Sequence, residues 1–476
     1  MAASPRSSQF LSRRLFVRML TYTPAACVLL PSIARAEETP SNTKWMRVRS
    51  VVELKGDVRL RDSKAVMRGA TKTVPIESTS TLDYEENFRA CPESFQGHFA
   101  YRHILEAKAE NRINQKPVDV SLRSDTQGIL SSMDGANFWT NSPDQPITAN
   151  ERDLLKGTIA SAFVDEVLPK KAVRVGESWN LSDEVVRRLF QLEQVTEQSI
   201  KITLGDADPE KAQLEISGRV TGASAEVPTE LQVQGKIQAD RKAGYVSWMA
   251  LNIHEKREIG EAEPGFDVEA RVRLLRAPLE KPTASETLLS AAARMPDFSM
   301  AKLLHFESKH NGFAFMAESD WRVLHDSPDQ MVMRYVKNNT VIAQCNIRRL
   351  TSLEPGLQTT LEAYQQMIGR SLSESLRQIL EGHESVTDAG LRMIKITAAG
   401  EAESVPVRWI SILLSDDQGQ RASMTFTFDE SMESRFGNAE VQIAGGFRFM
   451  GTQSEDSPAN ESKTTKVGSA TADTKR

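Results

Sequence analysis

Several features that mark enzymes and membrane proteins are scarce or absent in this sequence. Its 476 residues include three cysteines, and aromatic residues make up 6%. There is no Gly-x-Ser-x-Gly, His-Glu-x-x-His, Walker or Gly-x-Gly-x-x-Gly motif, which excludes the enzyme classes that these motifs identify. After the first 36 residues, no apolar run approaches the roughly 18 residues that a transmembrane helix needs. The composition therefore favours a soluble globular protein with no integral membrane span and no recognisable catalytic motif.

The chain also lacks an excess of positive charge. It has 59 basic and 64 acidic residues, a net charge of −5. The first 36 residues contain five arginines and no acidic residue, so their removal takes the net charge to −10. Without a basic cluster the chain is unsuited to the phosphate neutralisation that drives nucleic-acid binding. We expect no nucleic-acid partner.

Cysteine is too sparse for a disulfide framework. Cys27 lies in the first 36 residues, which leaves Cys91 and Cys345. These two fall in different predicted domains, so we expect two separate buried thiols rather than a bridge.

The first 36 residues have the layout of an export signal. The basic stretch Ser12-Arg13-Arg14-Leu15-Phe16-Val17-Arg18 precedes an apolar run, and Ala34-Arg35-Ala36 has the small-x-small pattern of a cleavage site. The paired arginines are typical of the twin-arginine signals that direct folded proteins across a membrane. We predict cleavage after Ala36 and a periplasmic or extracellular location.

Residues 44–276 alternate apolar and polar side chains with period two in several long segments. This alternation is typical of antiparallel strands with one buried and one solvated face. Turn signals such as Asp206-Ala207-Asp208-Pro209 separate the segments. A large, curved antiparallel sheet is therefore predicted, and its clearest strands are 52–60, 214–220, 231–237 and 268–274.

Two helices are expected to interrupt this sheet. The sequence Thr148-Ala149-Asn150-Glu151 has the pattern of a capping box and predicts a helix to about Val167, where Pro169 follows. Ser182 predicts the N-cap of a second helix. The segment Val173–Trp179 between them is predicted as a short strand.

Beyond the sheet, strands and helices mix. Residues 313–316, 331–336, 341–347, 391–397, 405–414 and 422–428 are predicted strands. Apolar residues at helical spacing from Leu361 to Ile379 predict a helix of five turns, opened by the capping box at Thr359. The segment Ser431–Phe449 is predicted to return as helix.

The fold class predicted is therefore α+β: a large curved antiparallel sheet with inserted helices, followed by a smaller α/β/α sandwich. The expected organisation is a signal peptide at 1–36, a β-rich domain at 37–276, a linker at 277–302, a sandwich domain at 303–450 and a disordered tail at 451–476.

The order of elements in the second domain resembles the PsbP-like α/β/α sandwich. The likeness rests on Gly312-Phe313-Ala314-Phe315, Asp320-Trp321-Arg322-Val323, the central helix, Val405-Pro406-Val407-Arg408-Trp409 and the closing strand-then-helix segment. It covers about 150 residues. The resemblance implies assembly or scaffolding partners more than enzymes, and it transfers no functional residue.

The first domain resembles an uncharacterised family of exported bacterial proteins, through the turn Val173-Arg174-Val175-Gly176-Glu177-Ser178-Trp179. That family has no established activity to carry over. A curved sheet with inserted helices is also loosely similar to periplasmic lipid-carrier folds, by fold analogy alone.

The sequence gives little support for a metal or catalytic site. His98 and His103 are five apart on a predicted strand, so they point to opposite faces and cannot share an ion with Cys91. Asp206 and Asp208 are interpreted as turn residues rather than calcium ligands. His305, His310 and His325 are expected to be surface or capping residues. We predict no catalytic residue, no metal and no cofactor.

Of the six tryptophans, Trp248, Trp321 and Trp409 have apolar neighbours in predicted strands and are expected in the core. Trp139 and Trp179 lie beside loops and helix starts, so they are the candidates for contact with a ligand or partner. The function predicted is that of an exported, non-enzymatic protein for binding or assembly with an envelope partner. The alternative is a carrier of an apolar small molecule or lipid in the concave face of the N-terminal sheet, and an enzyme with an interdomain site is third.

Overall fold

The computed structural model describes residues 45–61, 71–90, 97–134, 137–142, 145–284 and 302–450. The predicted signal peptide, Cys91, most of the linker and the predicted tail lie outside the described residues. The same holds for the side chains of His98 and Trp139, although their backbones lie in strands.

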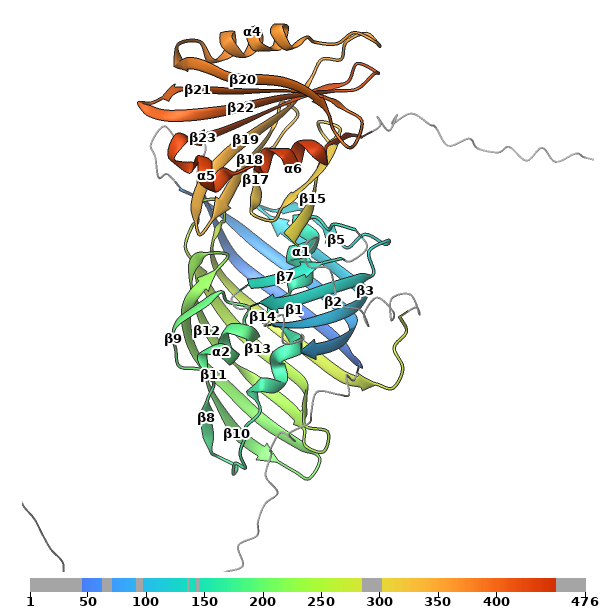
Figure 1. The fold of residues 1–476 in the computed structure, drawn as a ribbon. Coiled ribbons are helices and arrows are strands. Elements are labelled where there is room, and N and C mark those ends of the chain that lie inside the picture. Colours follow the sequence, from blue (N-terminus) through green and yellow to red (C-terminus); the bar gives the residue numbers. More distant parts are fainter. Residues whose placement is uncertain are drawn as a thin grey trace, which may run out of the picture.

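A single antiparallel sheet of 14 strands forms the N-terminal module (Figure 1). Its main path runs β7-β6-β3-β2-β1-β14-β13-β12-β11-β10-β8, so the first strand pairs with the last one near the middle of the sheet. The predicted curved antiparallel sheet is confirmed. Its strands are β1 (Trp45–Arg61), β2 (Thr71–Ala90), β3 (Gly97–Ile113), β4 (Lys116–Pro117), β5 (Val120–Ser121), β6 (Gly128–Asp134), β7 (Asn137–Asn141), β8 (Ser178–Asn180), β9 (Gln194–Gln198), β10 (Lys201–Ala207), β11 (Lys211–Ser224), β12 (Val227–Asp240), β13 (Tyr245–Arg257) and β14 (Gly265–Leu279).

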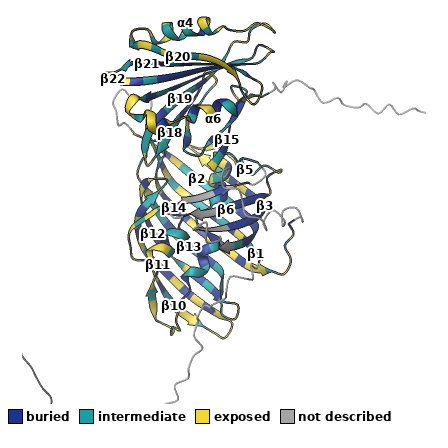
Figure 2. Ribbon diagram, viewed as in Figure 1, coloured by how far each residue is buried: buried dark blue, intermediate teal, exposed yellow. Residues whose placement is uncertain are grey.

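Three short helices cover the concave face of this sheet: α1 (Ala149–Lys156), the 3-10 helix η1 (Ser161–Val167) and α2 (Asp183–Leu189) (Figure 1). Their apolar side chains, such as Leu155 and Val186, share one core with the inward-facing residues of the strands. Outward-facing strand residues are exposed, so buried (dark blue) and exposed (yellow) positions alternate along the strands in Figure 2. We call the two sides of the sheet the inner and the outer face.

The helical segment differs from the predicted single helix over 148–167. The capping box is present, because Thr148 Oγ1 accepts from Glu151 N and the Glu151 carboxylate accepts from Thr148 N. However, α1 ends at Lys156, because Gly157 takes a positive φ of 64° and breaks the helical path. The chain then re-enters as η1. Ser182 caps α2 as predicted, whereas the predicted strand 173–179 is reduced to β8.

A buried polar network fixes η1 to the inner face. Glu86 accepts hydrogen bonds from Ser161 Oγ and from Arg102 Nε, both at 2.8 Å. Arg276 donates two bonds to the Asp165 carboxylate, at 2.6 and 3.0 Å. The hydrogen bond of Ser161 to Glu86 joins η1 to β2, and the ion pair of Asp165 with Arg276 joins η1 to β14. Arg102 of β3 holds Glu86 in place. Together these contacts set the position of η1 on the sheet.

The C-terminal module has a seven-stranded antiparallel sheet, β17-β18-β19-β23-β22-β21-β20, and a three-stranded sheet, β15-β16-β24. The helix α4 (Leu361–Leu372) packs on one face through Tyr364, while α5 (Glu433–Phe436) and α6 (Ala439–Gly445) cover the other, as a sandwich requires. Its strands are β15 (Leu303–Ser308), β16 (Phe313–Glu318), β17 (Trp321–Asp326), β18 (Met331–Lys337), β19 (Thr340–Leu350), β20 (Leu376–Val386), β21 (Arg392–Ala402), β22 (Val405–Ser415), β23 (Arg421–Asp429) and β24 (Arg448–Phe449). The predicted α+β class is confirmed.

The predicted bounds of two helices in this module are wrong. The helix predicted from Leu361 to Ile379 ends at Leu372, and residues 376–386 form the edge strand β20. Its N-cap is Thr360, whose Oγ1 accepts from Ala363 N, so the capping box at Thr359 does not form. The predicted helix 431–449 is split into a 3-10 turn, α5, α6 and β24.

The two modules meet through β15, which lies against α1. The backbone N–H of His305 donates to Ile147 O at 2.9 Å, and Thr148 and His305 form an isolated parallel bridge. Leu304 and Phe306 of β15 are buried in the same core as the N-terminal module. This core is continuous between the two modules.

Polar contacts complete the junction on another side. Arg322 Nε lies 2.7 Å from Glu263 Oε1, in the loop between β13 and β14. Arg334 donates to Glu261 O at 2.9 Å, and Glu261 N donates to Asn339 Oδ1 at 3.1 Å. None of the helices among the described residues is long and apolar enough to cross a membrane.

Candidate ligand-binding groove

Two β-bulges distort the outer face of the N-terminal sheet near one end. Between β10 and β11 the register shifts at Gly205, and between β12 and β13 it shifts around Ser247. A bulge bends its strand and re-aims the neighbouring side chain. In β13 the extra residue lets Val246 and Met249, three apart in sequence, both point into the core. Trp248 precedes Met249, Leu251 and Ile253, which alternate as core residues, so it lies on the outer face beside the bulge.

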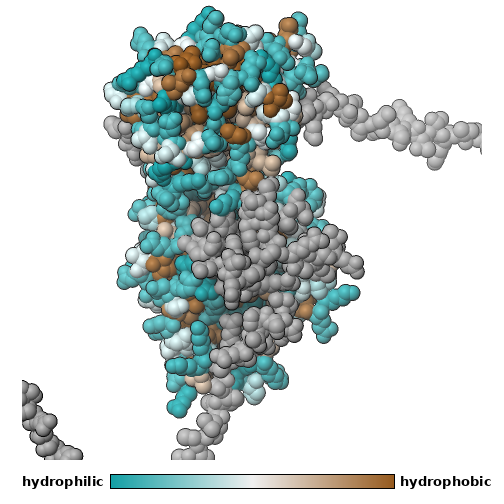
Figure 3. Space-filling model, viewed as in Figure 1, coloured by the Kyte–Doolittle hydropathy of each residue, from teal (hydrophilic) through white to brown (hydrophobic). Residues whose placement is uncertain are grey.

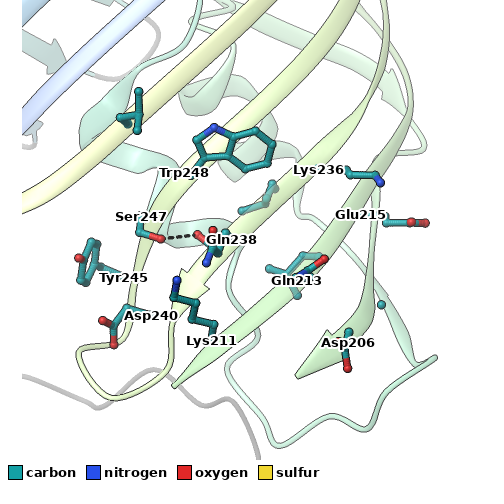
Figure 4. Close-up of a pocket in the computed structure, with 14 residues that line it drawn as sticks. Asp206, Lys211, Gln213, Glu215, Lys236, Gln238, Asp240, Tyr245, Ser247 and Trp248 are labelled. Atoms are coloured by element: carbon teal, nitrogen blue, oxygen red, sulfur yellow. Dashed lines mark hydrogen bonds between the residues drawn. The ribbon is translucent and has the colours of Figure 1, made fainter. Parts of the chain in front are cut away.

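An open groove of about 830 Å³ lies at these bulges. We call it the Trp248 groove (Figure 4). Its floor includes one cross-strand row that runs over four adjacent strands, in which Gln213 is opposite Gln238, Gln238 opposite Trp248, and Trp248 opposite Leu275. The lining residues are Gly205, Asp206, Lys211, Gln213, Leu214, Glu215, Lys236, Ile237, Gln238, Asp240, Tyr245, Ser247, Trp248 and Leu275.

Some polar side chains of the groove are bonded within their own turns: Asp206 Oδ1 accepts from Ala207 N and Asp240 Oδ1 from Ala243 N, both at 2.8 Å. Others are unpaired. Glu215 is directly opposite Lys236, and Lys211 is opposite Asp240, yet neither pair comes within ion-pair distance among the described residues. The side chains of Gln213, Gln238 and Tyr245 and the Trp248 indole N–H likewise make no hydrogen bond within the described part of the chain.

Some neighbouring charges elsewhere on the outer face do pair. Lys55 and Glu77 are opposite each other on β1 and β2, and their charged groups are 2.8 Å apart. Arg47 and Asp83 make two hydrogen bonds, at 2.6 and 2.9 Å. The groove therefore brings together an indole, two amides and a phenol that have no hydrogen-bond partner among the described residues.

The groups of the groove can donate and accept hydrogen bonds. Ser247 Oγ donates to Gln238 O at 3.2 Å, and no histidine or cysteine lines the groove to act as its base. Burial raises the pKa of Tyr245, and the nearby Asp240 carboxylate raises it further, so the phenol keeps its proton and can donate. Three carboxylates and two ammonium groups give the lining mixed charge.

Sequence reasoning placed Trp248 in the core, and this was wrong. Trp321 and Trp409 are buried as predicted, at 1% and 6% exposure, but Trp248 lines the groove. The available signal was the alternation of the core residues Met249, Leu251 and Ile253, which places Trp248 on the opposite face.

The predicted contact residues lie elsewhere. Trp179, in β8, is partly buried against the core, and its indole N–H donates to Val167 O at 3.1 Å. That bond ties β8 to the end of η1. Trp139 lies in β7, opposite Ser132, and its side chain is outside the described residues. Trp179 is not among the described residues that line the groove.

Asp208 is a turn residue, as predicted. Asp208 Oδ1 accepts from the backbone N–H groups of Glu210 and Lys211, which closes the hairpin between β10 and β11. His305, expected at the surface or as a cap, is instead largely buried, with a side chain that is 10% exposed, whereas His310 and His325 are exposed as predicted. Cys345 is free and buried, and burial raises its pKa well above the ordinary value. Among the described residues, no group of three or more His, Cys, Asp or Glu side chains could hold a metal ion.

Comparison with known proteins gives only slight similarities. No family model and no curated protein matches this sequence. The chain is similar to cyanobacterial PsbP from Synechocystis sp. PCC 6803, with a TM-score of 0.26 at 10% identity over 33% of this chain and 97% of that one. It is also similar to a lipovitellin, with a TM-score of 0.27 at 8% identity over 56% of this chain and 29% of that one. Neither similarity is strong enough to assign a family or a function.

Proposed function

We propose that this chain is an exported, non-enzymatic binding protein that holds its ligand in the Trp248 groove. The observation that carries the proposal is the set of unbonded amide and phenol side chains around an outward-facing tryptophan, beside two bulges. Binding sites typically combine a few convergent polar groups with aromatic surface in a concavity of this size. The basic and apolar leader pattern over residues 1–36 supports export to the periplasm or cell surface.

An assembly role for the C-terminal module is the second part of the proposal. Apolar side chains are exposed on and around α4 and β20, where Leu357 is 55%, Met367 48%, Leu380 43% and Val386 69% exposed. In Figure 3, brown patches gather on this module more than on the described surface of the other. Exposed apolar groups of this kind favour a protein contact.

The alternative of an apolar carrier has less support. It requires a cavity on the concave face of the N-terminal sheet, where α1, η1 and α2 instead fill the space with buried side chains in the described part of the chain. The groove lies on the opposite face, and its lining is mixed rather than apolar.

Native mass spectrometry of the mature protein, purified from its own host, tests the proposal. We expect a co-purifying small molecule that is lost from a Trp248→Ala variant and kept by Gln234→Ala, a residue of β12 on the same outer face but outside the groove. A ligand-free wild-type spectrum, or an adduct that survives Trp248→Ala, would overturn it. A second polypeptide in the spectrum, lost from Met367→Glu, would support the assembly role.

A further inference from the structure

We propose that the Trp248 groove binds an oligosaccharide. This inference rests on the proposed function and adds the chemical class of the ligand. It follows from the combination of a flat aromatic side chain and two amides along one open row of the sheet, with facing charges that form no ion pair in the rows on either side (Figure 4).

The aromatic ring supplies the first requirement. The face of an indole carries negative charge density, and it attracts the weakly positive C–H groups that cover one side of a sugar ring. Trp248 adds a free indole N–H as donor, and Leu275, 51% exposed, extends the apolar surface beside it. Because Trp248 offers both an apolar ring and a polar N–H group at the solvent boundary, it can contact a ligand that has both apolar and polar faces.

The polar side chains supply the second requirement. Gln213 and Gln238 each offer one acceptor and two donors, which matches the donor–acceptor character of neighbouring sugar hydroxyl groups. Glu215 and Asp240 are further acceptors, and Lys236 is a further donor. A neutral hydroxyl group can use all of these, and the mixture of three carboxylates and two ammonium groups gives the lining no large excess of one charge.

The shape of the groove favours an oligomer. The lining residues come from five adjacent strands, β10 to β14, and strands about 4.8 Å apart cover roughly 19 Å across the sheet. That length exceeds a single sugar ring.

Other ligand classes fit less well. A peptide bound by strand addition needs a free sheet edge, but the row Gln213–Gln238–Trp248–Leu275 crosses paired interior strands. Nucleic acid needs an excess of positive charge, which the lining lacks. A lipid chain needs a continuous apolar surface, and here polar side chains interrupt it.

Titration of the full mature chain with cellohexaose, chitohexaose and maltohexaose tests the inference, by calorimetry and by tryptophan fluorescence. We expect at least one of them to bind with a Kd below about 1 mM. Trp248→Ala should weaken that binding at least tenfold and Gln238→Ala about threefold, as expected for one lost hydrogen bond. Gln234→Ala is the matched control, since it removes the same side chain from the same strand and face, and it should leave the Kd unchanged.

The inference falls if none of the three sugars binds the wild-type chain, or if Trp248→Ala binds as tightly as wild type. Circular dichroism verifies that Trp248→Ala is folded, and Gln238→Ala provides a second reading if it is not. A Trp248-dependent adduct in native mass spectrometry that is not a sugar would overturn this inference and leave the proposed function standing. The absence of both adduct and sugar binding would overturn both.

Discussion

Glu86 shows how individual residues of the inner face depend on their partners. Its side chain is 2% exposed and that of Arg102 is 7% exposed, and they form a charge-assisted bond of 2.8 Å. Breaking a buried ion pair by removing one partner leaves an uncompensated charge. We predict that Glu86→Gln lowers the free energy of unfolding by about 3–5 kcal/mol, measured by urea denaturation of the mature chain.

The matched control for this variant lies on the same strand. Glu77 pairs with Lys55 on the exposed outer face, where water already solvates both charges. Glu77→Gln should therefore leave the denaturation midpoint unchanged. Equal effects of the two substitutions would show that the buried network does not hold η1 to the sheet.

His305 gives a second prediction at the scale of a residue. Burial lowers the pKa of His305 below 6.5, and the Arg448 and Arg123 guanidinium groups lower it further. The unfolded chain therefore binds a proton more readily than the folded one, so stability falls as pH drops below about 6.5. Urea midpoints measured from pH 8 to pH 5 should decline more steeply for wild type than for His305→Gln. Parallel curves would contradict this prediction.

The buried thiol of Cys345 gives a third prediction at the scale of a residue. Its thiol is 0% exposed, and its raised pKa keeps it protonated. In a mature Cys91→Ser chain, we predict no reaction with Ellman's reagent at pH 8 until denaturant is added, and then one thiol per chain. Complete labelling of the folded protein would show that β19 opens readily.

At the scale of elements, the break between α4 and β20 has a local cause. Residues 373–375 form a 3-10 turn that passes close to Gly400 of β21, and a Cβ at Gly400 would lie 1.9 Å from Ser375 O and 2.6 Å from the Trp409 ring. The chain can turn there only because Gly400 has no side chain.

We predict that Gly400→Ala lowers the free energy of unfolding by about 1–3 kcal/mol, the usual cost of overpacking. Gly369 is the matched comparison. It lies within α4, and a Cβ added there would meet no atom within 4 Å, so Gly369→Ala should raise stability by up to about 1 kcal/mol through helix propensity. Thermal unfolding of both variants distinguishes the two effects. Identical shifts would mean that the turn is not packed against β21.

The elements that sequence reasoning predicted well are those whose side chains follow one regular period. In β11 and β14, every second residue is buried over most of the strand, so alternation alone identified both strands. Leu376 and Ile379 misled the helix prediction, because their spacing also fits a helix, while the edge position of β20 is decided by pairing with β21. The Trp248 groove was missed for a similar reason: it exists where the period is broken.

For the whole molecule, the continuous core predicts joint unfolding of the two modules. Leu304 and Phe306 of β15 are 2% and 4% exposed, and they belong to the cluster that contains Leu155 of α1. Separating the modules would expose this apolar surface to water and break the ion pair of Arg322 with Glu263. From the sequence, two domains joined by a linker at 277–302 were expected.

Calorimetry of the mature chain should therefore show one transition, with equal calorimetric and van't Hoff enthalpies. Phe306→Ala should lower the midpoint of this transition, because truncating a buried phenylalanine costs about 3–5 kcal/mol. The variant should still unfold in one transition. Arg322→Ala removes a partly exposed pair and should shift the midpoint little. Two resolved transitions in the wild-type chain would instead mean that the modules fold independently and that the contact between β15 and α1 contributes little free energy.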